Sequence, residues 1–262
     1  MKKWLLLVIV IIMMASVGCR QTTSAPSVTK DAKSTFEAWL VAAKKIETMQ
    51  ENYEGTIEMT TKGGTQSVMI TMEGQLHAKG NYRLDEVAIT AGTTKQTIRQ
   101  YLFPDKVFVA TLVNGQWVAK EATPSIYFNA EEVQAELESL YKNGALVIEA
   151  KVERKLVSGE ECDEVRLSAD LAKFSLVDKK FLLYSSGLSS IPGVDAYVDA
   201  INSFDMRLCL LPSGMALESE IILKLNPDTL PPDGIVSAHV ATTITHYEIN
   251  PTIPDSFFNL PP

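Results

Sequence analysis

The chain has 262 residues, with 32 aspartates and glutamates against 24 lysines and arginines, and a formal net charge of −8. A protein this acidic is a poor partner for nucleic acid or for an anionic bilayer surface. The three histidines, His77, His239 and His246, show no metal-ligand spacing with the cysteines, and no Cys-x-x-Cys occurs. Gly-x-Ser-x-Gly, His-Glu-x-x-His and phosphate-binding glycine motifs are also absent from the sequence. We therefore expect no metal, no cofactor and no enzymatic activity.

The amino terminus has the layout of a secretory signal. Lys2 and Lys3 precede an apolar run over residues 5–14, and small residues follow it. This run is too short to span a bilayer, which takes about 20 apolar residues. The ending Ser16-Val17-Gly18-Cys19 resembles the lipobox of prokaryotic lipoproteins, in which the signal is cut before the cysteine and a diacylglyceryl group is attached to its sulfur. The alternative is an ordinary signal or an uncleaved anchor, with Cys19 present by chance.

The signal and the polar segment after it divide the chain into three parts. Residues 1–18 are predicted to be a signal peptide, 19–30 the lipidated Cys19 with a flexible polar tether, and 31–262 a single domain. One acyl chain holds a protein only marginally at a bilayer, at roughly 0.8 kcal/mol per buried methylene, so two chains are needed for stable attachment. We expect an extracytoplasmic protein anchored to the cell membrane or to an outer membrane.

The domain is predicted to open with an amphipathic helix and to continue as strands. Residues 31–50 carry one apolar stripe, formed by Phe36, Trp39, Leu40, Ala43, Ile46 and Met49. Alternation of apolar and polar residues then predicts strands at 53–60, 67–74, 75–86, 94–103, 107–113 and 116–119. Gly63-Gly64 is the expected first turn, and Asn114-Gly115 is a strong hairpin signal.

The hydrophobic period changes at Asn129. Asn129 and Glu132 resemble a capping box, an apolar stripe follows, and Gly144 is the expected stop, so a second helix is predicted. Strands resume at 145–155, 162–169, 204–211, 216–225 and 235–250. Between 170 and 203 the pattern breaks into apolar fragments, a serine-rich loop and a short helical stretch. This segment is predicted to be an insertion.

Together these elements indicate an α+β fold. Antiparallel meanders with helices on one face predict a strongly curled antiparallel sheet of about 11 strands, a half-barrel with helices packed on its concave face. Two or three helices fill such a face only partly. A cavity is therefore expected, although a core filled by its own side chains needs the same apolar faces.

Two cysteines remain for a disulfide after Cys19. On strand parity, Cys162 shares a face with Glu164 and Arg166, and Cys209 shares one with Arg207. A bridge between Cys162 and Cys209 is therefore predicted to join neighbouring strands on the outer surface of the sheet. Two unpaired, partly buried thiols remain the alternative.

Several charged residues have the chemistry of binding groups. The carboxylates of Glu160, Glu161, Asp163 and Glu164 would suit a calcium site, but a solvated loop is the commoner use of such a run. Arg83 and Arg99 lie on predicted strands, where an arginine usually faces solvent.

The chain resembles the LolA/LolB and LppX group of envelope proteins, also described as outer-membrane lipoprotein-sorting proteins. The resemblance rests on the lipobox, the helix at 31–50 leading into a strand at Tyr53, Gly80-Asn-Tyr-Arg-Leu84, the hairpin at Asn114-Gly-Gln-Trp117 and the ending at 247–261. It implies a curled half-barrel with helices as a lid over a hydrophobic cavity that receives acyl chains. The expected anchor, the insertion at 170–203 and the two downstream cysteines depart from the group, and the carrier's lid-latching arginine has no match here.

The resemblance suggests a lipid or acyl-chain ligand, bound in the cavity for holding or transfer. The cavity candidates are Trp39, Leu40, Ile57, Met59, Val68, Ile70, Met72 and Tyr82, each of which could equally be plain core. An envelope sensor or protein-interaction module that contacts an envelope protein partner without lipid transport is the second hypothesis. A structural lipoprotein is the third.

Overall fold

The computed structural model describes residues 31–63, 67–122, 130–149, 152–186 and 195–261. Its elements form an α+β fold, as expected. The helices are α1 (Ala32–Ala43), α2 (Ala130–Lys142), α3 (Leu176–Ser185) and α4 (Asp195–Val198), with 3-10 turns at Leu171–Lys173, Pro227–Thr229 and Asp255–Phe258. The strands are β1 (Thr48–Thr61), β2 (Ser67–Lys79), β3 (Tyr82–Ala91), β4 (Thr94–Leu102), β5 (Val107–Val113), β6 (Gln116–Glu121), β7 (Leu146–Ile148), β8 (Glu153–Val157), β9 (Glu160–Ala169), β10 (Ile201–Leu210), β11 (Ala216–Leu225) and β12 (Ile235–Ile249).

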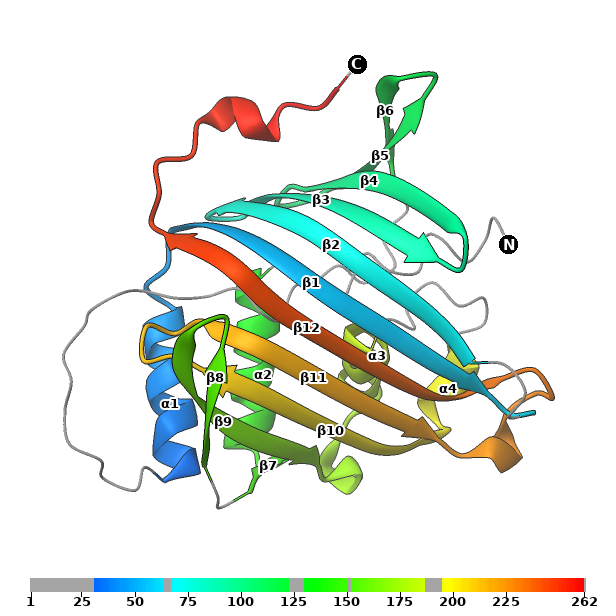
Figure 1. Cartoon of the computed structure of the whole chain (residues 1–262). Helices are drawn as coiled ribbons and strands as arrows, with labels where there is room; N and C mark the ends of the chain where they lie inside the picture. Colours follow the sequence, from blue (N-terminus) through cyan, green and yellow to red (C-terminus); the bar gives the residue numbers. More distant parts are fainter. Residues whose placement is uncertain (1–30, 64–66, 123–129, 150–151, 187–194, 262) are drawn as a thin grey trace.

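In the described part of the chain the strands form one antiparallel sheet of 12 strands, where the sequence predicted about 11. Their order is β6-β5-β4-β3-β2-β1-β12-β11-β10-β9-β7, with β8 paired to β9. The first and last long strands, β1 and β12, are neighbours at its centre, so the sheet is made of an amino-terminal and a carboxy-terminal half (Figure 1). The sheet is open, because its edge strands β6 and β7 are not paired with each other.

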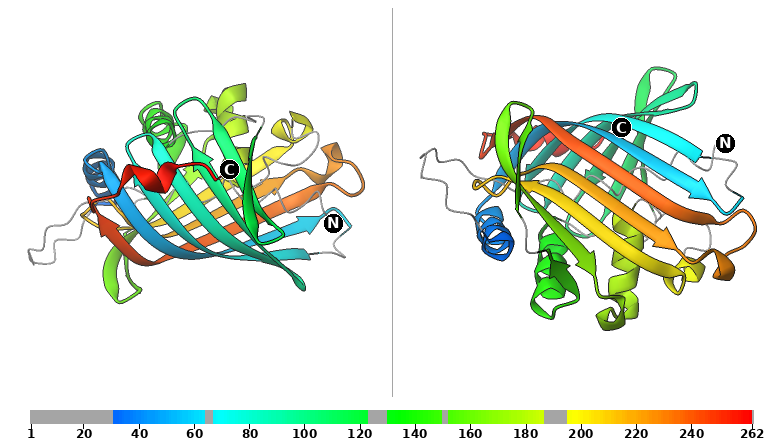
Figure 2. Two further views of the ribbon diagram at one scale, coloured as in Figure 1. Left: turned by 90° about the horizontal axis from the view of Figure 1, so that it is seen from above. Right: turned by 60° about the horizontal axis from the view of Figure 1, so that its bottom comes forward.

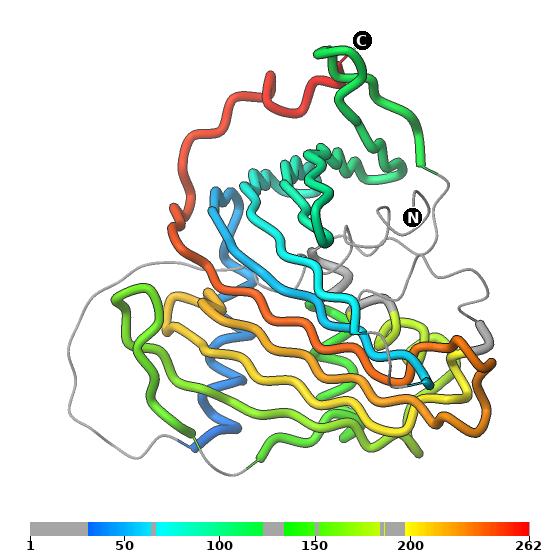
Figure 3. Tube along the Cα trace, turned by 45° about the vertical axis from the view of Figure 1, so that its right-hand side comes forward, coloured from blue at the N-terminus to red at the C-terminus, as the bar shows by residue number. Residues whose placement is uncertain are grey.

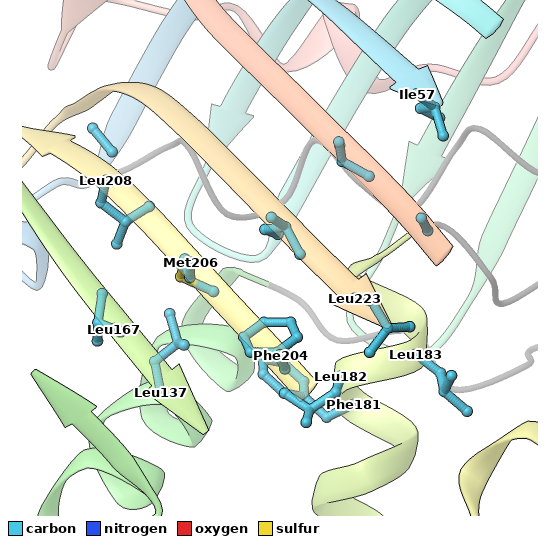
Figure 4. Close-up of a cluster of buried hydrophobic side chains, with 14 of the residues drawn as sticks. Ile57, Leu137, Leu167, Phe181, Leu182, Leu183, Phe204, Met206, Leu208 and Leu223 are labelled. Atoms are coloured by element: carbon cyan, nitrogen blue, oxygen red, sulfur yellow. The ribbon is translucent and has the colours of Figure 1, made fainter. Parts of the chain in front are cut away.

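The helices lie on one face of the sheet (Figures 1 and 2). Their main contacts are with the carboxy-terminal half: α1 with β9 and β10, α2 with β7, and α3 with β11. Figure 4 shows Phe204 of β10 beside Phe181 and Leu182 of α3. We call the helix-bearing side of the sheet the inner face and the other side the outer face. Within the described residues, no helix is both long and apolar enough to cross a bilayer.

Helix α1 is shorter than predicted. Asp31 caps it through a side-chain oxygen that accepts from the Ser34 amide at 3.2 Å. The helix buries the i, i+3, i+4 and i+7 stripe formed by Phe36, Trp39, Leu40 and Ala43. Met49, which the sequence placed on this stripe, belongs to β1 instead. Where a strand follows a helix after only a few residues, the hydrophobic pattern does not show where one ends and the other begins.

Strand boundaries also differ from the prediction at the β2–β3 turn. Strand β2 continues through Gly74 to Lys79, and the turn falls at Gly80, whose φ is +53°. The predicted hairpin at Asn114-Gly115 is confirmed, with φ of 51° and 80° at its two turn residues. The second helix is confirmed and ends before Gly144, at φ +73°. The predicted cap Asn129 and the turn residue Gly64 lie outside the described residues.

The predicted strand over 145–155 contains two short strands, β7 and β8, and the segment 170–203 holds a helix, α3, that the sequence did not predict. Strand β8 with the start of β9 forms a hairpin that folds over the outer face. Ser158 donates to the Ile244 carbonyl of β12 at 2.7 Å, and Tyr247 donates to Glu160 at 2.9 Å.

A disulfide joins Cys162 to Cys209, as predicted. Both cysteines lie on the outer-facing parity of their strands, and Cys209 is paired with Glu164 across the ladder. The bridge thus lies on the outer face of the sheet, as predicted, but each cysteine is only 2% exposed. The β8–β9 hairpin explains this burial, because its Lys155 reaches across to Glu164 and to Glu218 of β11.

The carboxy-terminal segment crosses the outer face of the amino-terminal half, ending near the β5–β6 hairpin (Figure 3). Ile253 and Phe258 join Leu84, Tyr101 and Ala110 in a small apolar cluster there. Lys79 holds the segment through Asp255 at 2.6 Å. The outer face of β3 and β4 is therefore partly buried, although it lies opposite the main core.

Candidate functional site

The inner face of β1 and β2 carries the predicted apolar residues. Ile57 and Met59 of β1, and Ile70 and Met72 of β2, are buried in the main hydrophobic cluster. Ile57 pairs with Ile70 across the ladder, so these side chains form one continuous surface. Val68 is partly buried at the edge of the same cluster.

The other three candidates lie elsewhere. Trp39 and Leu40 belong to the same large cluster, but the main contacts of their helix α1 are with β9 and β10. Tyr82 is 45% exposed on the outer face, where its ring approaches Phe103 and Phe258. Tyr82 therefore does not share the inner face with the other candidates, but it lines the open pocket described below. The inner-facing residues of β3 are the odd-numbered ones, which include Val87 and Ile89.

The inner face of the amino-terminal half is not where the described helices make their main contacts, since these fall on β7 and β9–β11. In Figure 4, Ile57 lies on β1 apart from the side chains that pack against α2 and α3. The apolar inner face of β1–β4 thus extends beyond the main helix contacts, and its residues Ile57, Met59, Ile70 and Met72 are at most 3% exposed.

An open pocket of about 1140 Å³ lies at the start of β1 and the end of β2. Met49 and Ala78 contribute to its wall from the inner face, and Gln134 and Glu138 contribute from α2. Lys44 forms a short ion pair with Glu138 at 2.5 Å beside it, between the end of α1 and α2. The pocket therefore opens at a junction of two helices and the sheet.

A row of polar side chains crosses the inner face just behind this pocket. Glu51 of β1 is paired with Leu76, Leu76 with Asp85 of β3, and Asp85 with Gln100 of β4. Met49 of the pocket wall lies two residues before Glu51 on the same face of β1, a spacing of about 7 Å. We call Glu51, Tyr53, Arg83, Asp85 and Gln100 the inner polar row; all five are buried.

Tyr53 and Asp85 are joined across an intervening strand. The Tyr53 hydroxyl donates to Asp85 Oδ1 at 2.8 Å, although Tyr53 lies on β1 and Asp85 on β3. Gly74 of β2, which is paired with Tyr53, makes room for this: a Cβ at Gly74 would lie 2.1 Å from the tyrosine ring. Glycine at this position therefore lets the ring lie flat across β2.

Burial dominates the electrostatics of the row. It raises the pKa of Glu51 from 4.5 to about 8, with Arg83 lowering it and Asp85 raising it further. Burial also raises the pKa of Asp85 from 3.8 to about 6, against the opposing effects of Arg83 and the Tyr53 hydrogen bond. The pKa of Tyr53 lies well above its usual value for the same reason. Two carboxyl groups thus share the neighbourhood of one guanidinium.

Sequence reasoning missed this row, yet parity could have found it. Glu51 has the same parity as Tyr53 and Ile57, and Arg83 and Asp85 the same parity as Val87. The prediction that Arg83 faces solvent is wrong, since Arg83 is buried on the inner face. For Arg99 the prediction holds: it is partly exposed, pairs with Glu86 at 2.5 Å and covers the Trp117 ring at 4.3 Å.

The acidic run at 160–164 is engaged by protein groups. Asp163 lies near Arg154, and Glu164 binds both Lys155 and Arg166, so its pKa is lowered despite burial. Among the described residues, no cluster of three or more histidine, cysteine or acidic side chains is arranged to hold a metal ion. Cys19 and its neighbours lie outside the described residues, so lipidation remains a prediction.

No protein-family model matches the chain, and no curated protein matches it. Among solved structures, LprF from Mycobacterium bovis is similar at 12% identity and a TM-score of 0.42, covering 86% of this chain and 96% of that one. A DUF1329 family protein from Desulfovibrio piger aligns at 7% identity and a TM-score of 0.31, covering 87% of this chain and 97% of that one. A domain from Vibrio parahaemolyticus, described as an outer-membrane lipoprotein-sorting protein, aligns at 7% identity and a TM-score of 0.30 with the same coverage.

The third of these structures carries the name of the group that the sequence resembles. At TM-scores below 0.5 the similarities say nothing about a ligand, so the function has to be inferred from this chain's own residues.

Proposed function

We propose that this protein is an extracytoplasmic lipoprotein that binds an acyl-chain ligand on the inner face of β1–β4 and performs no catalysis. The observation that carries the proposal is the apolar row of Ile57, Met59, Ile70 and Met72, which lies on the same inner face as Met49 of the wall of the pocket of about 1140 Å³. Ligand sites of this kind are concave and mostly apolar with a few polar anchors. Methionine side chains suit them because they adapt to chains of varying shape.

In this proposal the sheet acts as a half-barrel whose concave side holds the acyl chain. The junction of α1, α2 and the start of β1 is the entrance, and the ion pair between Lys44 and Glu138 bridges the two helices beside it. Lipid on Cys19, joined through the tether at 20–30, keeps the entrance near the membrane from which an acylated molecule is taken. Transfer of lipid or lipoprotein between membranes is the activity that such an arrangement serves.

The test is labelling with a photoactivatable fatty acid. The full chain is placed in lipid nanodiscs, empty nanodiscs serve as the background, and unlabelled fatty acid is added as competitor. Saturable labelling of the protein that the competitor removes is expected. Labelling that rises in proportion to the probe and resists competition would mean that the protein has no acyl-chain site.

One observation favours a second candidate function, that of a protein-interaction module. Leu176 and Val177 at the start of α3 are each 61% exposed, so the segment 170–203 offers apolar side chains to solvent. Exposed apolar groups that lie together mark interaction surfaces. Under this alternative an envelope protein binds α3, and the double variant Leu176→Ser/Val177→Ser loses that partner while fatty-acid labelling stays unchanged.

A further inference from the structure

The inner polar row contains buried polar atoms that the protein leaves without partners. Both carboxylate oxygens of Glu51 lack a hydrogen bond within the described structure, and so does Nε2 of Gln100. Glu51 is 0% exposed and Gln100 is 1% exposed. An unsatisfied buried polar group costs about 1–3 kcal/mol, and more when it is charged, so native proteins rarely keep one without a use.

Glu51, at one end of this row, lies close to the pocket, and Gln100 lies three strand spacings away at the other end. Glu51 and Gln100 belong to one register row across β1–β4, and the preceding row supplies Met49 and Ala78 to the pocket wall. A ligand that enters through the pocket and lies along the apolar surface therefore passes the row. At that point the carboxyl oxygens of Glu51 would accept hydrogen bonds from the polar group of the ligand.

The charges of the row indicate which polar group fits. Among the described residues, Arg83 is the guanidinium whose charge acts on both Glu51 and Asp85. Asp85 also receives the Tyr53 hydroxyl, whereas Glu51 receives no hydrogen bond from the described residues. On β12 the residue opposite Glu51 is Tyr247, whose hydroxyl donates to Glu160. The row therefore holds two carboxyl groups and one guanidinium. The carboxyl group in excess fits a positively charged group that donates hydrogen bonds.

We propose that the inner polar row binds the protonated amine of an amphiphilic ligand, with Glu51 as the carboxylate that accepts its hydrogen bonds. The inference rests on the proposed function, because the acyl chain of the same ligand occupies the apolar inner face. Without ligand, Glu51 is held neutral by a proton, because burial in an apolar face disfavours its charged form. Binding of the amine replaces this proton, which leaves to solvent.

The test compares three photoactivatable probes of equal chain length that end in an amine, an alcohol or a carboxylic acid. Labelling by each probe is measured on the full chain in nanodiscs, for the native protein, for Glu51→Gln and for Glu54→Gln. Glu54 is the matched control, because it lies on the same strand but is exposed on the other face. The amine is expected to bind best to the native chain, and Glu51→Gln is expected to weaken it roughly tenfold relative to the alcohol, as for a hydrogen bond to a charged group.

A pH series gives a second readout. Because Glu51 has a pKa of about 8, amine labelling of the native chain should rise from pH 6 to pH 8.5 and stay flat in Glu51→Gln. Equal binding of the three probes, or an amine preference that survives Glu51→Gln, would overturn the inference and leave the acyl-chain site standing. If none of the three probes gave saturable labelling of the native chain, the proposed function itself would be overturned.

Discussion

Tyr53 reaches its partner only because the strand between them carries a glycine. The hydroxyl donates to Asp85 at 2.8 Å, and the ring lies where a Cβ of Gly74 would be. We predict that Gly74→Ala lowers the free energy of unfolding by roughly 1–3 kcal/mol, the usual cost of overpacking a core. Urea unfolding measures it. In a Tyr53→Leu background the same substitution should cost much less, and an equal cost in both backgrounds would show that the ring is not the obstacle.

Glu51 links the stability of the fold to pH. Its pKa is about 8 in the folded protein against 4.5 ordinarily, so between these values the folded state keeps a proton that the unfolded state has lost. Stability from this group is therefore fully present below about pH 4.5 and declines as pH rises toward 8. Asp85 acts with the same sign at lower pH, since its pKa is raised from 3.8 to about 6.

We predict that Glu51→Gln is more stable than the native chain at pH 8 and that its melting temperature depends less on pH between 6 and 8. Thermal unfolding at several pH values checks this, with Glu54→Gln as the exposed control on the same strand. An unchanged pH dependence in Glu51→Gln would mean that Glu51 ionises normally in the folded protein.

The residues show what strand parity can predict. Ile57, Met59, Ile70 and Met72 lie on the inner face, as their alternation indicated. Tyr82 does not, because β3 carries Arg83 and Asp85 inward and Leu84 outward under the carboxy-terminal segment. A prediction from hydrophobicity alone assigns the two faces of such a strand the wrong way round. A distant segment buries its apolar outer side, and buried charged groups make its inner side polar.

At the scale of elements, the disulfide fixes β9 to β10 beneath the β8–β9 hairpin. Cys162 and Cys209 are 47 residues apart in sequence, and a loop of this length is worth roughly 4 kcal/mol in the chain-entropy account. We predict that the double variant Cys162→Ser/Cys209→Ser loses stability by up to this amount in urea unfolding. On denatured, unreduced protein, thiols titrating from either cysteine would contradict the bridge.

The existence of most elements followed from local pattern, but their placement did not. The hairpin at Asn114-Gly115 and the helix that ends before Gly144 were predictable, because their turn and cap residues are local signals. The burial of the cysteines was not, because it depends on contacts such as that of Ser158 with Ile244, 86 residues away. Helix α3 was missed because its apolar residues are not arranged on a single stripe.

For the whole molecule, membrane attachment is predicted to depend on one atom, the sulfur of Cys19. Cys19→Ser should prevent lipidation, so the protein should move from the membrane fraction to the soluble fraction after signal cleavage, or remain as an uncleaved precursor. Metabolic labelling with a fatty-acid analogue and fractionation of cells measure both outcomes. Labelling retained by Cys19→Ser would show that the lipid is attached elsewhere.

The measurement that tests the central claim most directly is a map of where a photoactivatable fatty acid attaches to the full chain in nanodiscs, read by peptide mass spectrometry. Met69 and Met72 are the internal comparison on β2, because Met69 is 58% exposed and Met72 is 1% exposed. We predict competed adducts at Met72, Ile70, Ile57 and Met59 on the inner face. Adducts confined to Met69 and other exposed side chains would contradict an acyl-chain site inside the fold.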